Sequence, residues 1–415
     1  MNIEIKNGRI IDPKNGVDRN ISLFIADGKV AALGEAPAGF TVEQIIDATG
    51  CVVCPGFIDL GARLNSIEAE LAAAVAGGVT SVVVPPDVDP PLDEPELGDR
   101  LVHRGKEIGK ARVLPLGALT LGLNGERLSE LAGLKKAGCV AFSQANKPVV
   151  DTEALLRAME YAATFGFAVW LQPQDYWLSR NGIAHEGEVA SRLGLACVLV
   201  PARTPCSATI VQLVPDTACR VHLTRLSSAA GVALLAQAKA EGLPISFDIG
   251  VHHLLLTEND IGFFNPHARF SPPLRAQNDR LALSNAAASG LAAICSDHTP
   301  VGADDKLLPF GEAKPGATGL EVLLPLTLKW AEAAKVSLSD ALARITSAPA
   351  KVLGLQTGQL ALGASADICI FDPEAIWQLT PEALKSRGKN SPWLSYMMTG
   401  KVTTTLVGGR VVYQA

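Results

Sequence analysis

Hydrophobic positions divide the chain into two β-rich ends and a long middle with a different pattern. Near the N-terminus, short segments of alternating hydrophobic and polar residues are separated by turn pairs of Asn, Asp, Gly and Pro. These segments are 3–5, 9–11, 22–25 and 29–30. The pattern returns at 367–372 and 404–413. We expect one small β-sandwich domain assembled from both termini, residues 1–53 plus 356–415.

The middle alternates apolar runs with amphipathic stretches such as 151–164 and 228–241, which have helical periodicity. The runs are 53–59, 79–84, 113–116, 140–142, 168–171, 196–200, 220–223, 244–248 and 292–295. This alternation predicts parallel strands joined by crossover helices. Nine runs are one more than a barrel needs, and we favour an α/β fold with a (β/α)₈ TIM barrel over 54–355. Function is then expected just after each run, at the carboxyl ends of the strands.

Composition narrows the class of protein. The chain of 415 residues is 48% hydrophobic and 19% charged, with a formal net charge of -6, as expected for a folded protein without a basic surface for nucleic acid. Residues 1–7 contain no charged stretch leading into an apolar run, and no apolar run is long enough to span a membrane. We therefore expect a soluble cytoplasmic protein that binds neither nucleic acid nor a membrane. The eight cysteines are scattered, which favours reduced thiols over a disulfide framework.

Short motifs along nearly the whole chain carry a family resemblance. The entry to the first barrel strand reads Pro-Gly-Phe-Ile-Asp at 55–59. Further matching segments are 76–84, 140–143, 252–257, 271–275, 296–300, 319–321 and 363–368. With these motifs the chain resembles the amidohydrolase superfamily, and within it bacterial dihydroorotase. The resemblance implies an amidohydrolase-type barrel whose activity depends on one or two zinc ions and an aspartate proton shuttle.

Most of the zinc ligands that the resemblance implies are replaced in this chain. The His-x-His positions of the family correspond to Gly61 and Arg63. The acidic pair after the fourth strand corresponds to Gln144 and Ala145, and a histidine after the next strand corresponds to Gln172. Glycine offers no ligand, a guanidinium repels a cation, and amides bind zinc poorly. We therefore expect no zinc and no other cofactor.

Two positions retain the family's residue type, namely His222, which matches a metal ligand, and Asp297, which matches the proton shuttle. A lone imidazole at a strand end is more often satisfied by a neighbouring hydroxyl than bound to a metal, and we expect this for His222. His252 and His253 are adjacent, so we expect one to be packed and the other exposed. We interpret Asp297 with His298 as a remnant of the ancestral site rather than a hydrolytic dyad.

Positions that would hold the substrate have changed as well. The family's arginine and asparagine contacts to dihydroorotate correspond to Asn65 and Asp87, and a family histidine corresponds to Val301. The guanidinium that would bind the carboxylate of the substrate is thus missing at Asn65. The carboxylate of Asp87 would repel the substrate instead. An anionic pyrimidine is expected to bind poorly.

Two functions fit the replaced and retained positions described above. The first is a non-catalytic dihydroorotase homologue, because some bacteria pair aspartate carbamoyltransferase with an inactive dihydroorotase-like chain that supports its assembly. The chain resembles that subunit, and we expect the carbamoyltransferase catalytic chain and a second copy of itself, in a homodimer, as its partners in pyrimidine biosynthesis. The second is a metal-dependent amidohydrolase with an altered metal site that acts on a cyclic amide.

Loss of the metal raises an electrostatic problem at the barrel mouth. Without cations, Asp297 and Asp87 would be left partly buried with uncompensated charge, which costs several kcal/mol when such groups are desolvated. Arg63 projects from the first barrel strand into the space that a metal would occupy. We therefore predict that Arg63 pairs with Asp297, directly or through one water molecule.

Overall fold

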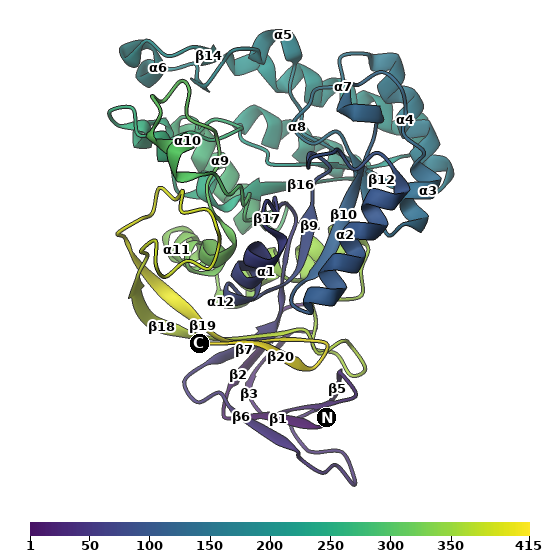
Figure 1. The fold of residues 1–415 in the computed structure, drawn as a ribbon, viewed down its shortest axis with the longest axis vertical. Coiled ribbons are helices and arrows are strands. Elements are labelled where there is room, and N and C mark those ends of the chain that lie inside the picture. Colours follow the sequence, from purple (N-terminus) through teal and green to yellow (C-terminus); the bar gives the residue numbers. More distant parts are fainter.

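The computed structural model describes the backbone of residues 1–415 and every side chain except that of residue 200. Its centre is an eight-stranded parallel sheet that curves into a barrel (Figure 1). The strands, in spatial order, are β8 (Phe57–Asp59), β9 (Val79–Val84), β10 (Arg112–Ala118), β11 (Ala141–Ser143), β12 (Ala168–Leu171), β15 (Arg220–Leu223), β16 (Ile245–Gly250) and β17 (Ala293–Cys295). A bridge between Ala62 and His298 joins the segments that follow the first and last strands. The predicted (β/α)₈ barrel is confirmed.

The ninth apolar run is not a barrel strand. Within 196–200, the segment β14 (Cys197–Val198) pairs with β13 (Ala184–His185) in a separate two-stranded parallel sheet. This small sheet lies in the connection between β12 and β15, which pair directly with each other. A short apolar run has the same sequence pattern whether it packs in a barrel or in an insertion, so the surplus strand could not be recognised from periodicity.

Helices surround the barrel and begin where the sequence provides caps. Asp151 accepts hydrogen bonds from the backbone N–H groups of Glu153 and Ala154, and the Ser228 hydroxyl accepts one from Gly231 N. The two predicted helices follow these caps and are confirmed as α4 (Thr152–Thr164) and α8 (Ala229–Ala240). The other outer helices are α1 (Ile67–Ala76), α2 (Pro95–Ile108), α3 (Leu131–Lys136), α7 (Thr204–Thr217), α9 (Gln277–Ala288), α11 (Leu323–Ala334), α12 (Leu338–Ile345) and α13 (Ser347–Leu353).

Short helices lie in the loops between these elements. They are α5 (Tyr176–Ser179), α6 (Glu188–Leu193), α10 (Ala303–Leu307) and the 3₁₀ turns η1 (Leu121–Leu123), η2 (Val200–Ala202), η3 (Val251–Leu254), η4 (Glu258–Ile261), η5 (Pro266–Ala268) and η6 (Leu320–Val322). In Figure 1, α5, α6 and α10 lie at the end of the barrel that is opposite the small domain. Among the helices that the structure describes, none is long and apolar enough to cross a membrane.

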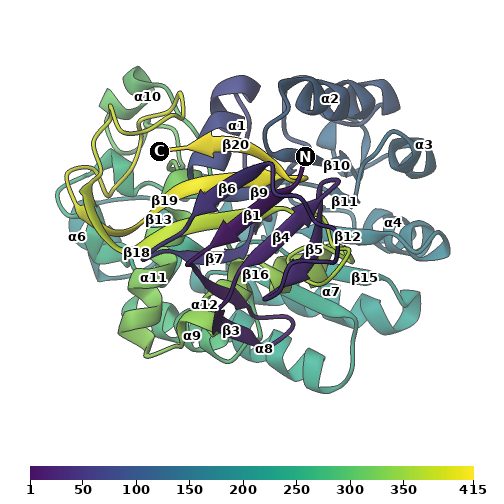
Figure 2. The same ribbon diagram turned by 90° about the horizontal axis from the view of Figure 1, so that it is seen from below.

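Two sheets form the small domain, and both termini contribute to it (Figure 2). One sheet has the order β5-β4-β1-β6 and the other β20-β19-β18-β7-β2-β3. Their bounds are β1 (Ile3–Lys6), β2 (Arg9–Asp12), β3 (Val17–Asn20), β4 (Leu23–Ala26), β5 (Lys29–Leu33), β6 (Gln44–Asp47), β7 (Val52–Pro55), β18 (Ile368–Gln378), β19 (Met397–Val407) and β20 (Arg410–Gln414). Buried aliphatic side chains such as Ile3, Ile10, Val53 and Ile368 form a core of their own. The chain passes from this domain into the barrel between β7 and β8.

A buried histidine–carboxylate pair joins three distant segments beside the barrel. Glu70 on α1 and His298 after β17 are both fully buried, and His298 Nε2 lies 3.0 Å from Glu70 Oε2. His298 Nδ1 accepts a hydrogen bond from Gly319 N at 3.0 Å, so Nε2 carries the proton and donates to Glu70. Glu70 also accepts a hydrogen bond from Arg387 N. Burial alone would raise the pKa of Glu70, but the hydrogen bond and charge of His298, with the hydrogen bonds from Ser386 and Arg387, together outweigh burial, and the pKa is lowered.

We expect Glu70→Ala to lower the free energy of unfolding by about 3 kcal/mol, because it leaves a buried imidazole N–H without its acceptor. Chemical denaturation at neutral pH measures this loss. Because the pKa of Glu70 is lowered in the fold, its stabilisation is present above the ordinary carboxyl pKa and is lost as the pH falls. Glu68→Ala on the same helix removes an exposed surface pair and is the matched control. Equal stability of the two variants would contradict the role given to the buried pair.

Candidate functional site at the barrel mouth

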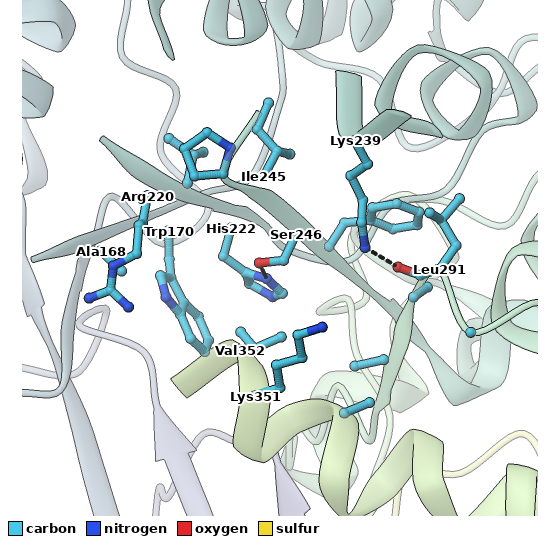
Figure 3. A pocket seen from close by; sticks show the side chains of 17 residues that line it. Ala168, Trp170, Arg220, His222, Lys239, Ile245, Ser246, Leu291, Lys351 and Val352 are labelled. Atoms are coloured by element: carbon cyan, nitrogen blue, oxygen red, sulfur yellow. Dashed lines mark hydrogen bonds between the residues drawn. The ribbon is translucent and has the colours of Figure 1, made fainter. Parts of the chain in front are cut away.

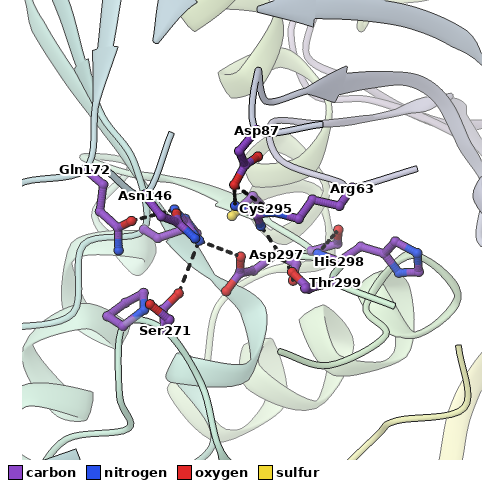
Figure 4. A network of polar contacts seen from close by, with 12 residues as sticks. Arg63, Asp87, Asn146, Gln172, Ser271, Cys295, Asp297, His298 and Thr299 are labelled. Atoms are coloured by element: carbon purple, nitrogen blue, oxygen red, sulfur yellow. Dashed lines mark hydrogen bonds and ion pairs between the residues drawn. The ribbon is translucent and has the colours of Figure 1, made fainter. Parts of the chain in front are cut away.

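A buried ion pair lies at the carboxyl ends of the barrel strands. Arg225 Nη1 is 3.2 Å from Asp297 Oδ1, and both side chains are at least nine-tenths buried. The other terminal nitrogen of Arg225, Nη2, donates to Gln172 Oε1 at 2.8 Å and to the Asn146 side chain. Figure 4 shows Gln172, Asn146 and Asp297 converging on this centre. One guanidinium therefore connects loops from four barrel strands.

Arg225 and Asp297 share an unusual backbone conformation. Arg225 and Asp297 have φ angles of 51° and 47°, in the left-handed region that residues other than glycine rarely adopt. The backbone N–H of Arg225 donates to Asp248 Oδ1 at 2.8 Å, and this bond holds the turn after β15. Such conformations persist where the surroundings fix them, as this buried carboxylate does here.

Burial and charge act in opposite directions on these groups. Burial raises the pKa of Asp297, and the charges of Arg225 and Arg63 oppose that rise without cancelling it. Burial would lower the pKa of Arg225, but nearby acidic groups, with Asp297 and Asp87 acting most strongly, together outweigh it, so its pKa is raised. The guanidinium therefore stays charged and supplies the positive charge of the site.

Arg63 is placed as expected but pairs with a different carboxylate. Its Nη2 is 2.7 Å and its Nε 3.1 Å from Asp87 Oδ2, while Nη1 donates to Thr299 Oγ1 at 3.2 Å. The predicted direct pair with Asp297 is therefore wrong. The Pro-rich loop after β9 carries Asp87 to Arg63, and Asp297 is already neutralised by Arg225. Each of the two carboxylates is paired with an arginine, Asp87 with Arg63 and Asp297 with Arg225.

His222 lies below the mouth, within the barrel, rather than at the site. Its Nδ1 is 2.8 Å from Ser246 Oγ, its Nε2 is 2.8 Å from Asp248 Oδ2, and its ring packs against Trp170. The neighbouring hydroxyl was expected and is confirmed. His222, which was matched to a metal ligand of the family, does not line the mouth, whereas Arg225, two residues after β15, lies there beside Asp297.

Arg225 is the functional residue that sequence reasoning missed. It follows the apolar run 220–223 by two positions, so the rule that strand ends carry function could have found it. His222 is the more obvious candidate in the sequence, because an imidazole is a commoner metal ligand than a guanidinium. Position after the end of a strand, rather than the type of side chain, identifies the residue at the mouth.

Both adjacent histidines are buried, which contradicts the expectation that one is exposed. They lie in η3 rather than on a strand, so their side chains do not alternate between two faces. His252 Nδ1 accepts a hydrogen bond from Trp393 Nε1 at 3.0 Å, and His253 Nε2 lies 3.0 Å from the Pro272 carbonyl. Burial lowers the pKa of His252 to about 3 and that of His253 to about 4, so both are neutral near pH 7.

The remaining predicted positions are engaged in local contacts around the mouth. Gln144 Oε1 accepts from Thr120 Oγ1 at 3.0 Å, and Asn65 Nδ2 donates to the Pro300 carbonyl at 2.8 Å. The backbone N–H of Val301 donates to Asn390 Oδ1 at 2.9 Å. Asn65, Val301, Arg63 and Arg225 line an open pocket of about 290 Å³ over the ion pairs. Gln144 is not among its lining residues.

The donors at the mouth do not fit a zinc ion. A cavity of about 30 Å³ lined by Gly61, Arg63, Arg225, Cys295 and Asp297 remains between the strand ends, which is room for about one water molecule. Two guanidinium groups border it, and burial raises the pKa of the Cys295 thiol well above its usual value, so the thiol stays protonated. Within the described residues, no group of three or more His, Cys, Asp and Glu side chains could hold a metal ion.

Comparisons with known proteins agree with this architecture. Residues 50–230 match the family described as dihydro-orotase-like, and residues 218–413 match the amidohydrolase family. A "Dihydroorotase-like protein" of Pseudomonas aeruginosa is 40% identical over 100% of both chains, and a "Dihydroorotase" of Syntrophotalea carbinolica is 37% identical over 100% of this chain and 99% of its own. The solved L-hydantoinase (dihydropyrimidinase) of Arthrobacter aurescens has a TM-score of 0.87 at 23% identity, covering 99% of this chain and 96% of that chain.

Fold and sequence together define an amidohydrolase-superfamily protein with a TIM barrel and a β-sandwich. Within that superfamily the chain belongs to the dihydroorotase-like family. The likeness to the hydantoinase concerns the fold.

We expect Arg225→Ala to lower the free energy of unfolding by about 3–5 kcal/mol at neutral pH, because Asp297 would be left buried and unpaired. Asp297→Asn in the same chain should restore much of this loss, since it removes the uncompensated charge. Denaturant unfolding of both single variants and the double variant measures the coupling. Additive losses with no coupling would show that the pair does not hold the mouth together.

Proposed function

We propose that this chain is a catalytically inactive dihydroorotase homologue that serves as a structural subunit of aspartate carbamoyltransferase, in the cytoplasmic pathway of pyrimidine biosynthesis. The observation that carries the proposal is the buried pair between Arg225 and Asp297. It joins the residue that matches the family's proton shuttle to a fixed cation at the mouth. A carboxylate held in this way is a structural group.

Hydrolysis of a cyclic amide needs an activated water, and the described mouth offers no group that activates one. In the family resemblance, metal ions lower the pKa of water and aspartate accepts its proton. Here arginines border the small cavity, and His252 and His253 are buried away from it with other partners. Asp297 Oδ1 lies 3.2 Å from Arg225 Nη1, so this carboxylate oxygen is held in a buried ion pair.

Substrate binding is opposed in the same way. Asp87 places a carboxylate where an anionic substrate would need a cation, and the guanidinium of Arg63 is already bound to it. The Asn65 amide is bound to a backbone carbonyl. A dihydroorotate carboxylate would have to displace at least one of these contacts.

The alternative, a metal-dependent amidohydrolase acting on a cyclic amide, is favoured by the name of the Syntrophotalea carbinolica relative. The positions of Arg63 and Arg225 oppose it, because each places a permanent positive charge beside the space that a metal would need. Metal content and turnover distinguish the two functions.

Two groups of exposed apolar side chains suit a protein with two kinds of interface. Phe263, Leu307 and Leu308, which we call the rim patch, lie close to α10 and η5, where Lys306 Nζ donates to the Pro266 carbonyl. Ile376 and Met397, which we call the hairpin patch, lie on the antiparallel pair β18 and β19. Large exposed apolar side chains that gather in patches are typical of interaction surfaces. The proposed assembly needs one surface for the carbamoyltransferase and another for a second copy of this chain.

Purified protein should contain less than one zinc ion per chain, because Gly61, Arg63, Gln144 and Gln172 provide no strong ligand and Arg225 adds a second cation. Elemental analysis after purification without chelator measures this. A stoichiometric zinc whose removal unfolds the protein or abolishes an activity would contradict the proposal.

The double substitution Gly61→His with Arg63→His provides a stricter version of this test. We expect no dihydroorotase activity from it, because Gln172 and Arg225 remain and the substrate contacts at Asn65 and Asp87 are still altered. Measurable turnover of dihydroorotate would show that fewer changes separate this chain from an active enzyme.

The chain should co-elute with the aspartate carbamoyltransferase catalytic chain when both are produced together, and the carbamoyltransferase should lose size or stability without it. Phe263→Glu with Leu307→Glu, and Ile376→Glu with Met397→Glu, place charges on the two patches. We expect one pair to weaken the mixed complex and the other to weaken the homodimer, as measured by size-exclusion chromatography with light scattering. A carbamoyltransferase with the same size, stability and activity in the presence and absence of this chain would refute the structural role.

A further inference from the structure

A cavity of about 360 Å³ opens at the amino ends of the barrel strands, opposite the mouth. Its walls come from the first residues of β12, β15, β16 and β17 and from α13, which includes Ala348 and Val352. Figure 3 shows these side chains from close by. Its volume lies in the range of pockets that bind small organic molecules, and nothing in the proposed function uses it.

Apolar atoms make up most of the surface of this cavity. Small side chains, among them Ala168, Ala292, Ala293 and Ala348, leave space that larger residues would fill in a closely packed barrel end. Trp170 is fully buried beside them, and within the described residues its Nε1 has no hydrogen-bond partner.

Positive charge surrounds the cavity without matching negative charge. Arg220, Lys239 and Lys351 line it, and no aspartate or glutamate is among its lining residues. Arg220 Nη2 donates to the Gly166 carbonyl at 2.7 Å and Lys239 Nζ to the Leu291 carbonyl at 3.0 Å. Among the described side chains, no carboxylate forms an ion pair with any of the three cations. Burial and the nearby charge of Lys351 lower the pKa of Lys239, the direction expected of cations that lack an anion.

We propose that this cavity is a binding site for a small organic anion with an apolar body and a single carboxylate. The apolar body fits the alanine-lined space, and the carboxylate fits the rim, where Lys239 and Lys351 provide charge. An uncharged molecule of the same shape loses the attraction, and an organic cation is repelled. The proposal does not depend on the partner proposed above.

Binding of phenylbutyrate, phenylbutyramide and phenylbutylamine to the full-length protein, measured by titration calorimetry, tests the proposal. The three probes share one body and differ in charge. We expect the carboxylate to bind, the amide to bind about tenfold more weakly, and the amine to show no binding. Equal affinity for all three, or no binding of the carboxylate at millimolar concentration, would overturn the proposal.

Variants locate the site. Lys239→Met with Lys351→Glu should abolish phenylbutyrate binding, whereas Lys136→Glu on α3, outside the cavity, should leave it unchanged. Ala348→Phe should block binding by filling the space. If that variant does not fold, the lysine variants decide alone, because Lys351 is exposed and Lys239 half-buried. Retained binding in the lysine double variant would show that the anion binds elsewhere.

Discussion

The mouth of this barrel depends on the electrostatic pairing of Arg225 with Asp297. The carboxylate is buried, and a buried charge without a partner is among the most destabilising features a protein can contain. The guanidinium that neutralises it also contacts Gln172 and Asn146, so it fixes the loops after β11 and β12. Arg63 forms a second ion pair, with Asp87, beside this centre. Two buried or half-buried ion pairs therefore hold neighbouring loops together at the mouth.

The interior of the barrel connects this centre to the opposite end of the strands. Ser246, which lines the lower cavity, lies within hydrogen-bond distance of His222, and His222 lies equally close to Asp248. Asp248 accepts the backbone N–H of Arg225 at the mouth. A continuous set of hydrogen bonds therefore crosses the layer of apolar side chains that fills the barrel. Substitution of His222 would affect the cavity and the mouth together.

The hydrophobic periodicity of the sequence predicts the architecture but does not predict which charged residues pair. Alternating apolar runs predicted the barrel because strand and helix patterns depend on local spacing. The surplus run at 196–200 could not be excluded, since an apolar segment in an insertion has the same pattern as a barrel strand. The partner of Arg63 depended on the path of the loop that carries Asp87, and loop paths are not encoded in spacing. His222 was matched to a metal ligand by its residue type, whereas Arg225 reaches the mouth because it follows the end of β15.

The use of arginine at the mouth has a consequence for how the protein is made in the cell. A metal centre must be loaded after synthesis, can be emptied by a chelator, and can accept the wrong ion when supplies change. The guanidinium groups of Arg63 and Arg225 are part of the polypeptide and keep their charge across the physiological pH range. The positive charge of these two groups is therefore present as soon as the chain folds and needs no ion to be loaded.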